Sequence, residues 1–189
     1  LLLLGNVHSY DVVTVAAVWA SYLIVRSILV RKIDLRLISL SALAALIASP
    51  AALYQFWLYH IDPVFKARAN SPTPSPALWA FFAGYGLVLV GAIIGAVLWS
   101  RDRGEDSQRS ALSPQLLIVW SVIGFALPYL PVGQQRKLIM GLHIPLCILC
   151  AYAIGRLTAT KPRLSPILVN AVALAITMPS ILLFMRQDM

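Results

Sequence analysis

Long apolar blocks separated by short polar segments run through the chain, and this pattern predicts membrane-spanning helices. A helix needs about 20 apolar residues to cross the hydrocarbon core of a bilayer. These blocks are apolar almost throughout, whereas a core helix of a soluble domain shows only an apolar stripe. We predict six helices, near residues 11–30, 37–59, 78–100, 115–130, 138–157 and 167–184.

Only α-helices account for blocks of this length, because a helix pairs its own backbone groups where no water is present. A β-barrel would show strands of about ten residues that alternate apolar and polar positions. We therefore predict an all-α fold, a single polytopic transmembrane bundle over residues 1–189. The chain opens on four leucines in mid-pattern, without the basic region of a signal peptide, so we expect a fragment of a larger protein.

The amino-acid composition agrees with a membrane protein. Hydrophobic residues make up 60% of the chain and charged residues 12%, against roughly 25% charged residues in a soluble domain. The mean hydropathy is +0.82. A net charge of +8 could indicate nucleic-acid binding in a soluble protein, but the basic residues sit mainly in the connections between blocks. Membrane topology explains that placement better, so we predict membrane lipids as partners and no nucleic acid.

Lysine and arginine counts predict the orientation. The connections between the first and second, third and fourth, and fifth and sixth blocks hold ten of these residues, and the opposite side holds five. The positive-inside rule places the richer side in the cytoplasm. In a cell membrane, residues 60–76, read as a proline-rich loop, and residues 132–137 are then extracytoplasmic. Aromatic residues at both ends of the first of these loops fit a membrane-interface belt there.

The connection at residues 132–137 carries the sharpest candidate chemistry, with two amides followed by two adjacent cations. Arginine offers a planar fork to phosphate and lysine a mobile point charge, so the group suits a lipid phosphate or pyrophosphate. The alternative is an unselective anchor to lipid head groups. The predicted substrate-binding residues here are Gln134, Gln135, Arg136 and Lys137.

Two further positions are candidates for substrate contact. Asp62 in the outer loop could contact a sugar or a metal ion. His143 lies in the fifth predicted helix, which Pro145 is expected to kink, and an intramembrane ionisable group is a functional candidate. A neutral histidine bonded to another helix is the alternative. The scattered histidines predict no metal site, and we predict no cofactor.

Two short motifs indicate packing rather than chemistry. Cys147 and Cys150 have the spacing of a redox motif but lack its βαβ context, so we interpret them as small packing residues. Gly91 and Gly95 form a G-x-x-x-G motif, which lets another helix approach closely.

Several strings together resemble the C-terminal part of bacterial multi-pass proteins related to the GT-C glycosyltransferases, which use polyprenyl-phosphate-linked sugars. The resemblance covers roughly residues 54–155. The matching pieces are Asp62-Pro63-Val64-Phe65, Asn70 with Ser75-Pro76, Gly84-Tyr85-Gly86, Gln135-Arg136-Lys137 and Gly141-Leu142-His143-Ile144-Pro145.

The resemblance implies a membrane portion of a glycosyltransferase-like protein that takes sugar from a polyprenyl phosphate carrier. It also implies an acidic catalytic residue in an outward loop upstream of this chain, so the catalytic residues stay unknown and the fragment alone is expected to be inactive. Two other functions remain open, a non-catalytic scaffold subunit and a transporter. The transporter hypothesis uses prolines that could break helices around a midplane site, namely Pro50, Pro128, Pro145 and Pro179.

The orientation is testable by labelling intact cells in a variant whose two native cysteines are replaced. Asn70→Cys should react with a membrane-impermeant thiol reagent, because the loop at residues 60–76 is predicted to face outward. Gly104→Cys should react only after the membrane is permeabilised. The reverse pattern would invert the orientation.

Overall fold

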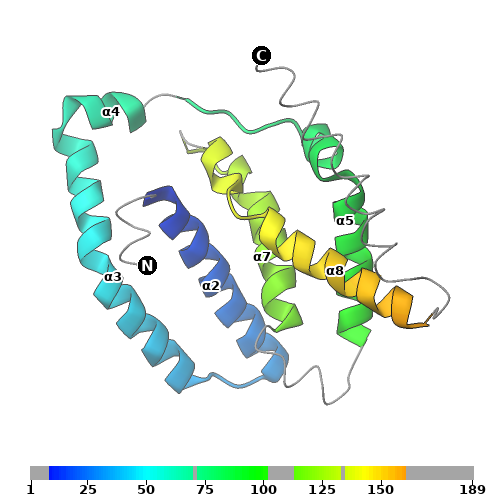
Figure 1. Ribbon diagram of the computed structural model, residues 1–189. Helices are drawn as coiled ribbons and strands as arrows, with labels where there is room; N and C mark the ends of the chain where they lie inside the picture. The colour runs from blue at the N-terminus through cyan, green and yellow to red at the C-terminus, as the bar shows by residue number, and fades with distance from the viewer. Residues whose placement is uncertain (1–8, 70–71, 102–112, 133–134, 161–189) are drawn as a thin grey trace. The chain divides into compact units, whose positions relative to one another are not determined.

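A computed structural model describes residues 9–69, 72–101, 113–132 and 135–160, and all regular structure in these ranges is helical. The six α-helices are α2 (Ser9–Val30), α3 (Leu35–Ile61), α4 (Pro63–Ala69), α5 (Leu78–Arg101), α7 (Pro114–Ala126) and α8 (His143–Thr160). Two short 3-10 helices, η1 (Leu127–Tyr129) and η2 (Gln135–Ile139), lie between α7 and α8 (Figure 1). The all-α prediction is confirmed.

Four helical stretches are long and apolar enough to cross a membrane. They are Asp11–Val30, Leu35–Ile61, Leu78–Arg101 and Gln135–Ala159, and α7 with η1 forms a shorter apolar helix. The first three match the predicted spans near residues 11–30, 37–59 and 78–100. The predicted helix at residues 167–184 lies outside the described residues. The chain is thus a multi-pass membrane protein.

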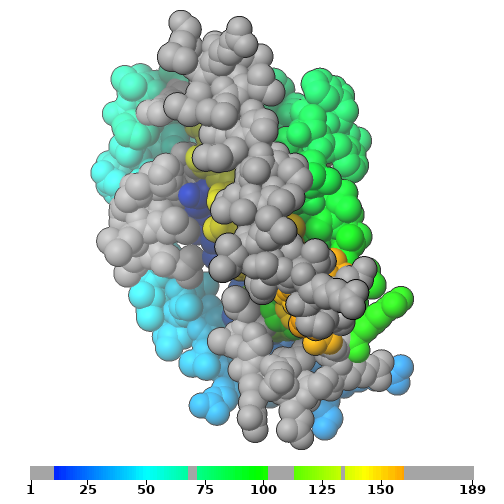
Figure 2. Space-filling view, turned by 45° about the vertical axis from the view of Figure 1, so that its right-hand side comes forward, coloured from blue at the N-terminus to red at the C-terminus, as the bar shows by residue number. Residues whose placement is uncertain are grey.

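The surfaces of these helices fit a lipid environment. Large apolar side chains stand well exposed, among them Leu35 at 75%, Trp79 at 72% and Ile28 at 68%. Along α3 only Ala48 and Ala51 are buried, and Figure 2 shows side chains of α3 and α4 at the molecular surface. A helix that is apolar on every side is stable where lipid or other helices cover it.

The chain divides into two compact units, each described here by itself. Unit 1 comprises residues 1–75 and 119–142, and unit 2 comprises residues 76–118 and 143–189. In unit 1, α2 and α3 form a helical hairpin. The indole Nε1 of Trp19 donates to the hydroxyl of Ser41 at 2.8 Å, which joins the two helices within their apolar spans.

Pro50 leaves α3 continuous from Leu35 to Ile61. Proline has no N–H, so the carbonyl of Leu46, four residues earlier, lacks its usual helical donor. The hydroxyl of Ser49 donates to that carbonyl at 2.7 Å. Because unpaired backbone groups are costly in lipid, this bond lets a proline stand inside a membrane span.

Two predictions about the ends of helices are wrong. Residues 60–76 are not loop throughout, because α4 occupies Pro63–Ala69. Pro145 does not kink the fifth helix. It is the third residue of α8, where a proline removes no intrahelical bond. The helix expected from residue 138 begins at His143 instead, after η2 and a turn in which Gly141 has a φ of 86°.

Unit 2 is built on the contact between α5 and α8. A Cβ placed on Gly95 would collide with the carbonyl oxygen of Leu149 and lie 2.7 Å from its carbonyl carbon. At Gly91 the same space holds the side chain of Cys150. Trp99 stacks on Tyr152 with ring centroids 4.5 Å apart. The close approach predicted from the G-x-x-x-G motif is confirmed, and Cys150 fills the gap that one of the glycines leaves.

Gly95→Ala should destabilise the protein by about 1–3 kcal/mol, the usual cost of overpacking, because the added methyl group meets rigid backbone. The free energy of unfolding in mixed detergent micelles measures the effect. Gly155→Ala is the matched control, since a Cβ there has no neighbour within 4 Å. That control should be neutral or slightly stabilising, because alanine favours a helix more than glycine does. Equal effects of the two substitutions would contradict the proposed packing.

Candidate functional site

The side chain of Gln135 joins two connections that are far apart in sequence. Its Oε1 accepts from the backbone amide of Ser75 at 3.1 Å, across 60 residues. Its Nε2 donates to the carbonyl of Leu130 at 2.7 Å. Both ends of the amide are therefore bound to backbone. We call residues 73–75 together with residues 128–132, Gln135 and Arg136 the loop junction.

Backbone and hydroxyl contacts complete the loop junction. The amide of Arg136 donates to the carbonyl of Thr73 at 3.1 Å, and the hydroxyl of Ser75 donates to the carbonyl of Pro128. These bonds hold the segment before α5 against η1 and η2, all within unit 1. The two connections predicted separately to share one side of the membrane are hydrogen-bonded to each other.

Buried apolar residues fix the base of the loop junction. Leu127, Pro128 and Leu138 are buried in η1 and η2, which pack on each other, and η2 also packs on α2. Leu142 is 1% exposed and fits against Gly124, where a Cβ would lie 2.8 Å from its Cδ1. The polar residues of this site therefore stand on a packed support.

The two adjacent cations differ in exposure. Arg136 is exposed, and its guanidinium forms no hydrogen bond or ion pair with a residue that the structure describes. Lys137 is half-buried. Arg136 is thus anchored by its backbone at Thr73, while its side chain is available to a ligand.

Of the predicted site residues, Gln135 and Asp62 hold structural positions. Oδ1 of Asp62 accepts from the amides of Val64 at 2.8 Å and Phe65 at 3.2 Å, and so caps the start of α4. Aspartate followed by proline is a helix-start signal that the sequence reading missed. Among the described contacts, no hydrogen bond brings Asp62 to the loop junction.

The remaining predicted residues belong to another unit or lie outside the described residues. His143 is exposed and begins α8, in unit 2, while Arg136 belongs to unit 1. Gln134 lies outside the described residues. Within the described ranges, no three His, Cys, Asp or Glu residues are placed to hold a metal ion.

The contacts or burial of three residues were not predicted from the sequence. Thr73 and Ser75 lie between prolines, and only the fold shows that their backbone meets η2. Asp11 lies in the first turn of α2, and its Oδ1 is buried without a hydrogen-bond partner in the part of the chain that is described. An acid near the start of an apolar span was the available signal for Asp11.

Comparison with known proteins finds no match: no family model, no curated protein and no solved structure is similar to this chain. The loop junction and the exposed Arg136 are therefore the basis for assigning a function.

Gln135→Met should open the loop junction, because it keeps the side-chain length but removes both hydrogen bonds. Hydrogen-exchange mass spectrometry of a peptide that covers Ser75 should show faster exchange of that amide. Gln115→Met is the control, since the only described hydrogen bond of Gln115 is local, from the Ser113 hydroxyl at 3.2 Å. Unchanged exchange at Ser75 in Gln135→Met would show that Gln135 does not hold the two connections together.

Proposed function

We propose that this chain is the membrane portion of a glycosyltransferase-like protein that binds a lipid-phosphate-linked sugar at the loop junction. The exposed guanidinium of Arg136 on a fixed backbone is the observation that carries the proposal. The resemblance to the GT-C glycosyltransferases supplies the substrate class, a polyprenyl phosphate sugar carrier. Lys137 supplies a second positive charge next to Arg136 in the sequence.

Rigid support favours selective recognition over loose anchoring. A loop that is ordered before binding loses little conformational entropy when the ligand arrives. Arg136 is held at its amide by Thr73, and the neighbouring Gln135 is bound at both ends of its amide. A planar guanidinium on a backbone held in this way can form paired hydrogen bonds to phosphate oxygens.

The depth of the loop junction suits a lipid head group. Its residues 73–75 come between α4 and α5 in sequence, and its Gln135 and Arg136 begin the candidate span Gln135–Ala159. In sequence, residues 62–77 are flanked by spans that end and begin with exposed aromatic side chains: Trp57 is 55% exposed near the end of α3, and Trp79 is 72% exposed near the start of α5. Tryptophan favours the interface between lipid and water. The excess of Lys and Arg in the opposite connections supports an extracytoplasmic position for the loop junction.

In sugar transfer from such a carrier, the departing group is an anionic phosphate. A cation fixed against the developing charge lowers the barrier of that step. Arg136 would serve in this way and, with Lys137, would hold the carrier. The residue that activates the acceptor is not assigned.

A transporter is a second candidate, favoured by an interruption in α5. Gly86 has φ 41° and ψ −119°, so α5 consists of two helical segments that meet there. Interrupted spans line substrate sites in many transporters. The prolines on which this hypothesis was based support it less, since Pro50 lies in a continuous helix and Pro145 in a first turn.

Arg136→Ala should weaken binding of a polyprenyl phosphate carrier by about ten-fold or more, because a hydrogen bond to a charged group contributes roughly 1.5–3 kcal/mol. Arg136→Lys should recover only part of the affinity, since the planar fork is lost. Carrier binding to the purified protein in nanodiscs measures both effects.

Lys66→Ala is the matched control, because Lys66 is an exposed cation of α4 in the same loop region. If Lys66→Ala and Arg136→Ala weaken binding equally, diffuse attraction between cations and lipid explains the affinity. In that case the selective site proposed at the loop junction is wrong.

A further inference from the structure

A pocket lies at the turn between α2 and α3. Figure 1 shows this turn between the C-terminal end of α2 and the start of α3. The volume of the pocket is about 270 Å3. The chain leaves α2 at Arg31, which has a φ of 54°, and enters α3 at Asp34, whose Oδ1 accepts from the amide of Leu37 at 3.0 Å. The lining residues are Leu23, Arg26, Ser27, Val30, Lys32, Ile33, Asp34, Leu37 and Ile38.

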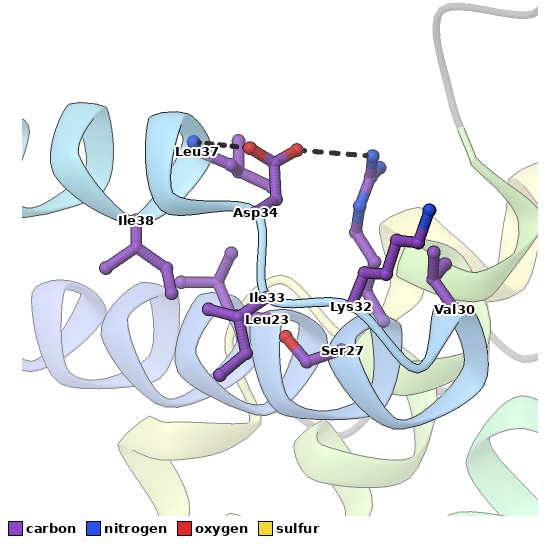
Figure 3. Close-up of a pocket in the computed structure, with 9 residues that line it drawn as sticks. Leu23, Ser27, Val30, Lys32, Ile33, Asp34, Leu37 and Ile38 are labelled. Carbon is purple, nitrogen blue, oxygen red and sulfur yellow. Dashed lines mark hydrogen bonds and ion pairs between the residues drawn. The ribbon is translucent and has the colours of Figure 1, made fainter.

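Some of the charged side chains of this pocket have partners and others have none among the described residues. Nη2 of Arg26 lies 3.7 Å from Oδ2 of Asp34, and Nη1 of Arg26 donates to the hydroxyl of Tyr22 at 3.2 Å. The single acid is therefore paired. Lys32 is exposed. Neither the amine of Lys32 nor the side-chain hydroxyl of Ser27 forms a hydrogen bond or ion pair with a described residue. Figure 3 shows the Lys32 amine on the side of the turn that carries the Asp34 carboxylate.

The rest of the pocket is apolar, with five aliphatic side chains around the two uncommitted polar groups. Several of these face outward, including Val30 at 56% and Ile33 at 68% exposed. The pocket also lies where two membrane spans end, which is the level of lipid head groups. A ligand that fits must combine a negative charge with a hydrocarbon chain.

We propose that this pocket binds an anionic glycerophospholipid, with its phosphate at Lys32 and Ser27 and the start of an acyl chain along the aliphatic wall. Basic pockets between transmembrane helices bind acidic lipid head groups in this way. Arg31 and Arg36 flank the turn and add attraction, so the region keeps a net positive charge after Arg26 and Asp34 pair. The site is distinct from the loop junction and does not depend on the function proposed there.

Native mass spectrometry of the full chain in detergent tests the site. The first phosphatidylglycerol should bind at least five-fold more tightly than phosphatidylcholine. Lys32→Gln should reduce phosphatidylglycerol affinity by about five-fold, the contribution of one cation near a charged surface. Arg36→Gln removes the same charge from the first turn of α3, beside the pocket but outside its lining, and it should change the affinity by less than two-fold.

A second pair of variants changes shape without changing charge. Ser27→Leu should fill the pocket and reduce phosphatidylglycerol binding, whereas Ser39→Leu, at an exposed position of α3, should leave it unchanged. Equal effects of Lys32→Gln and Arg36→Gln would overturn the proposal in favour of diffuse attraction. Displacement of the lipid by millimolar glycerol 3-phosphate would overturn it in favour of a soluble phosphate, and no preference for phosphatidylglycerol would overturn it outright.

Discussion

Backbone hydrogen bonding in an apolar surrounding is the constraint on which the rest of this structure depends. Where a span carries proline, a nearby hydroxyl replaces the missing donor, as Ser49 does for the carbonyl of Leu46. Two of the helices that begin in connections are capped by an aspartate. Asp34 caps α3, and Asp62 caps α4. Several polar side chains that are candidates for catalysis or binding in the sequence therefore form hydrogen bonds to backbone groups.

The same constraint gathers the remaining polar groups at the two ends of unit 1. At one end, Gln135 takes up backbone groups from two connections and leaves Arg136 exposed. At the other end, Arg26 and Asp34 pair across the turn between α2 and α3 and leave Lys32 exposed. Each end thus contains a structural bond and a cation whose side chain is uncommitted among the described residues. Those cations, rather than the total charge, are the basis of the two binding sites proposed for anionic ligands.

Both ligands proposed here combine phosphate with hydrocarbon, as expected for sites at the level of lipid head groups. The sites differ in rigidity. The loop junction rests on buried leucines and on a network of backbone bonds, which suits selective recognition of a carrier. The pocket between α2 and α3 is lined in part by exposed aliphatic side chains, which suits a lipid of the surrounding bilayer.

The sequence by itself determined the class of protein and its long spans, because hydrophobicity summed over about 20 residues decides membrane insertion without reference to neighbours. It also indicated a close helix approach at Gly91 and Gly95. Tertiary structure decided that α8 is the helix that approaches, and that Cys150 fills the gap. It also decided the role of Gln135, whose partner Ser75 is 60 residues away. Local pattern carries no information on such a contact, because the two segments meet only when the helices between them have packed.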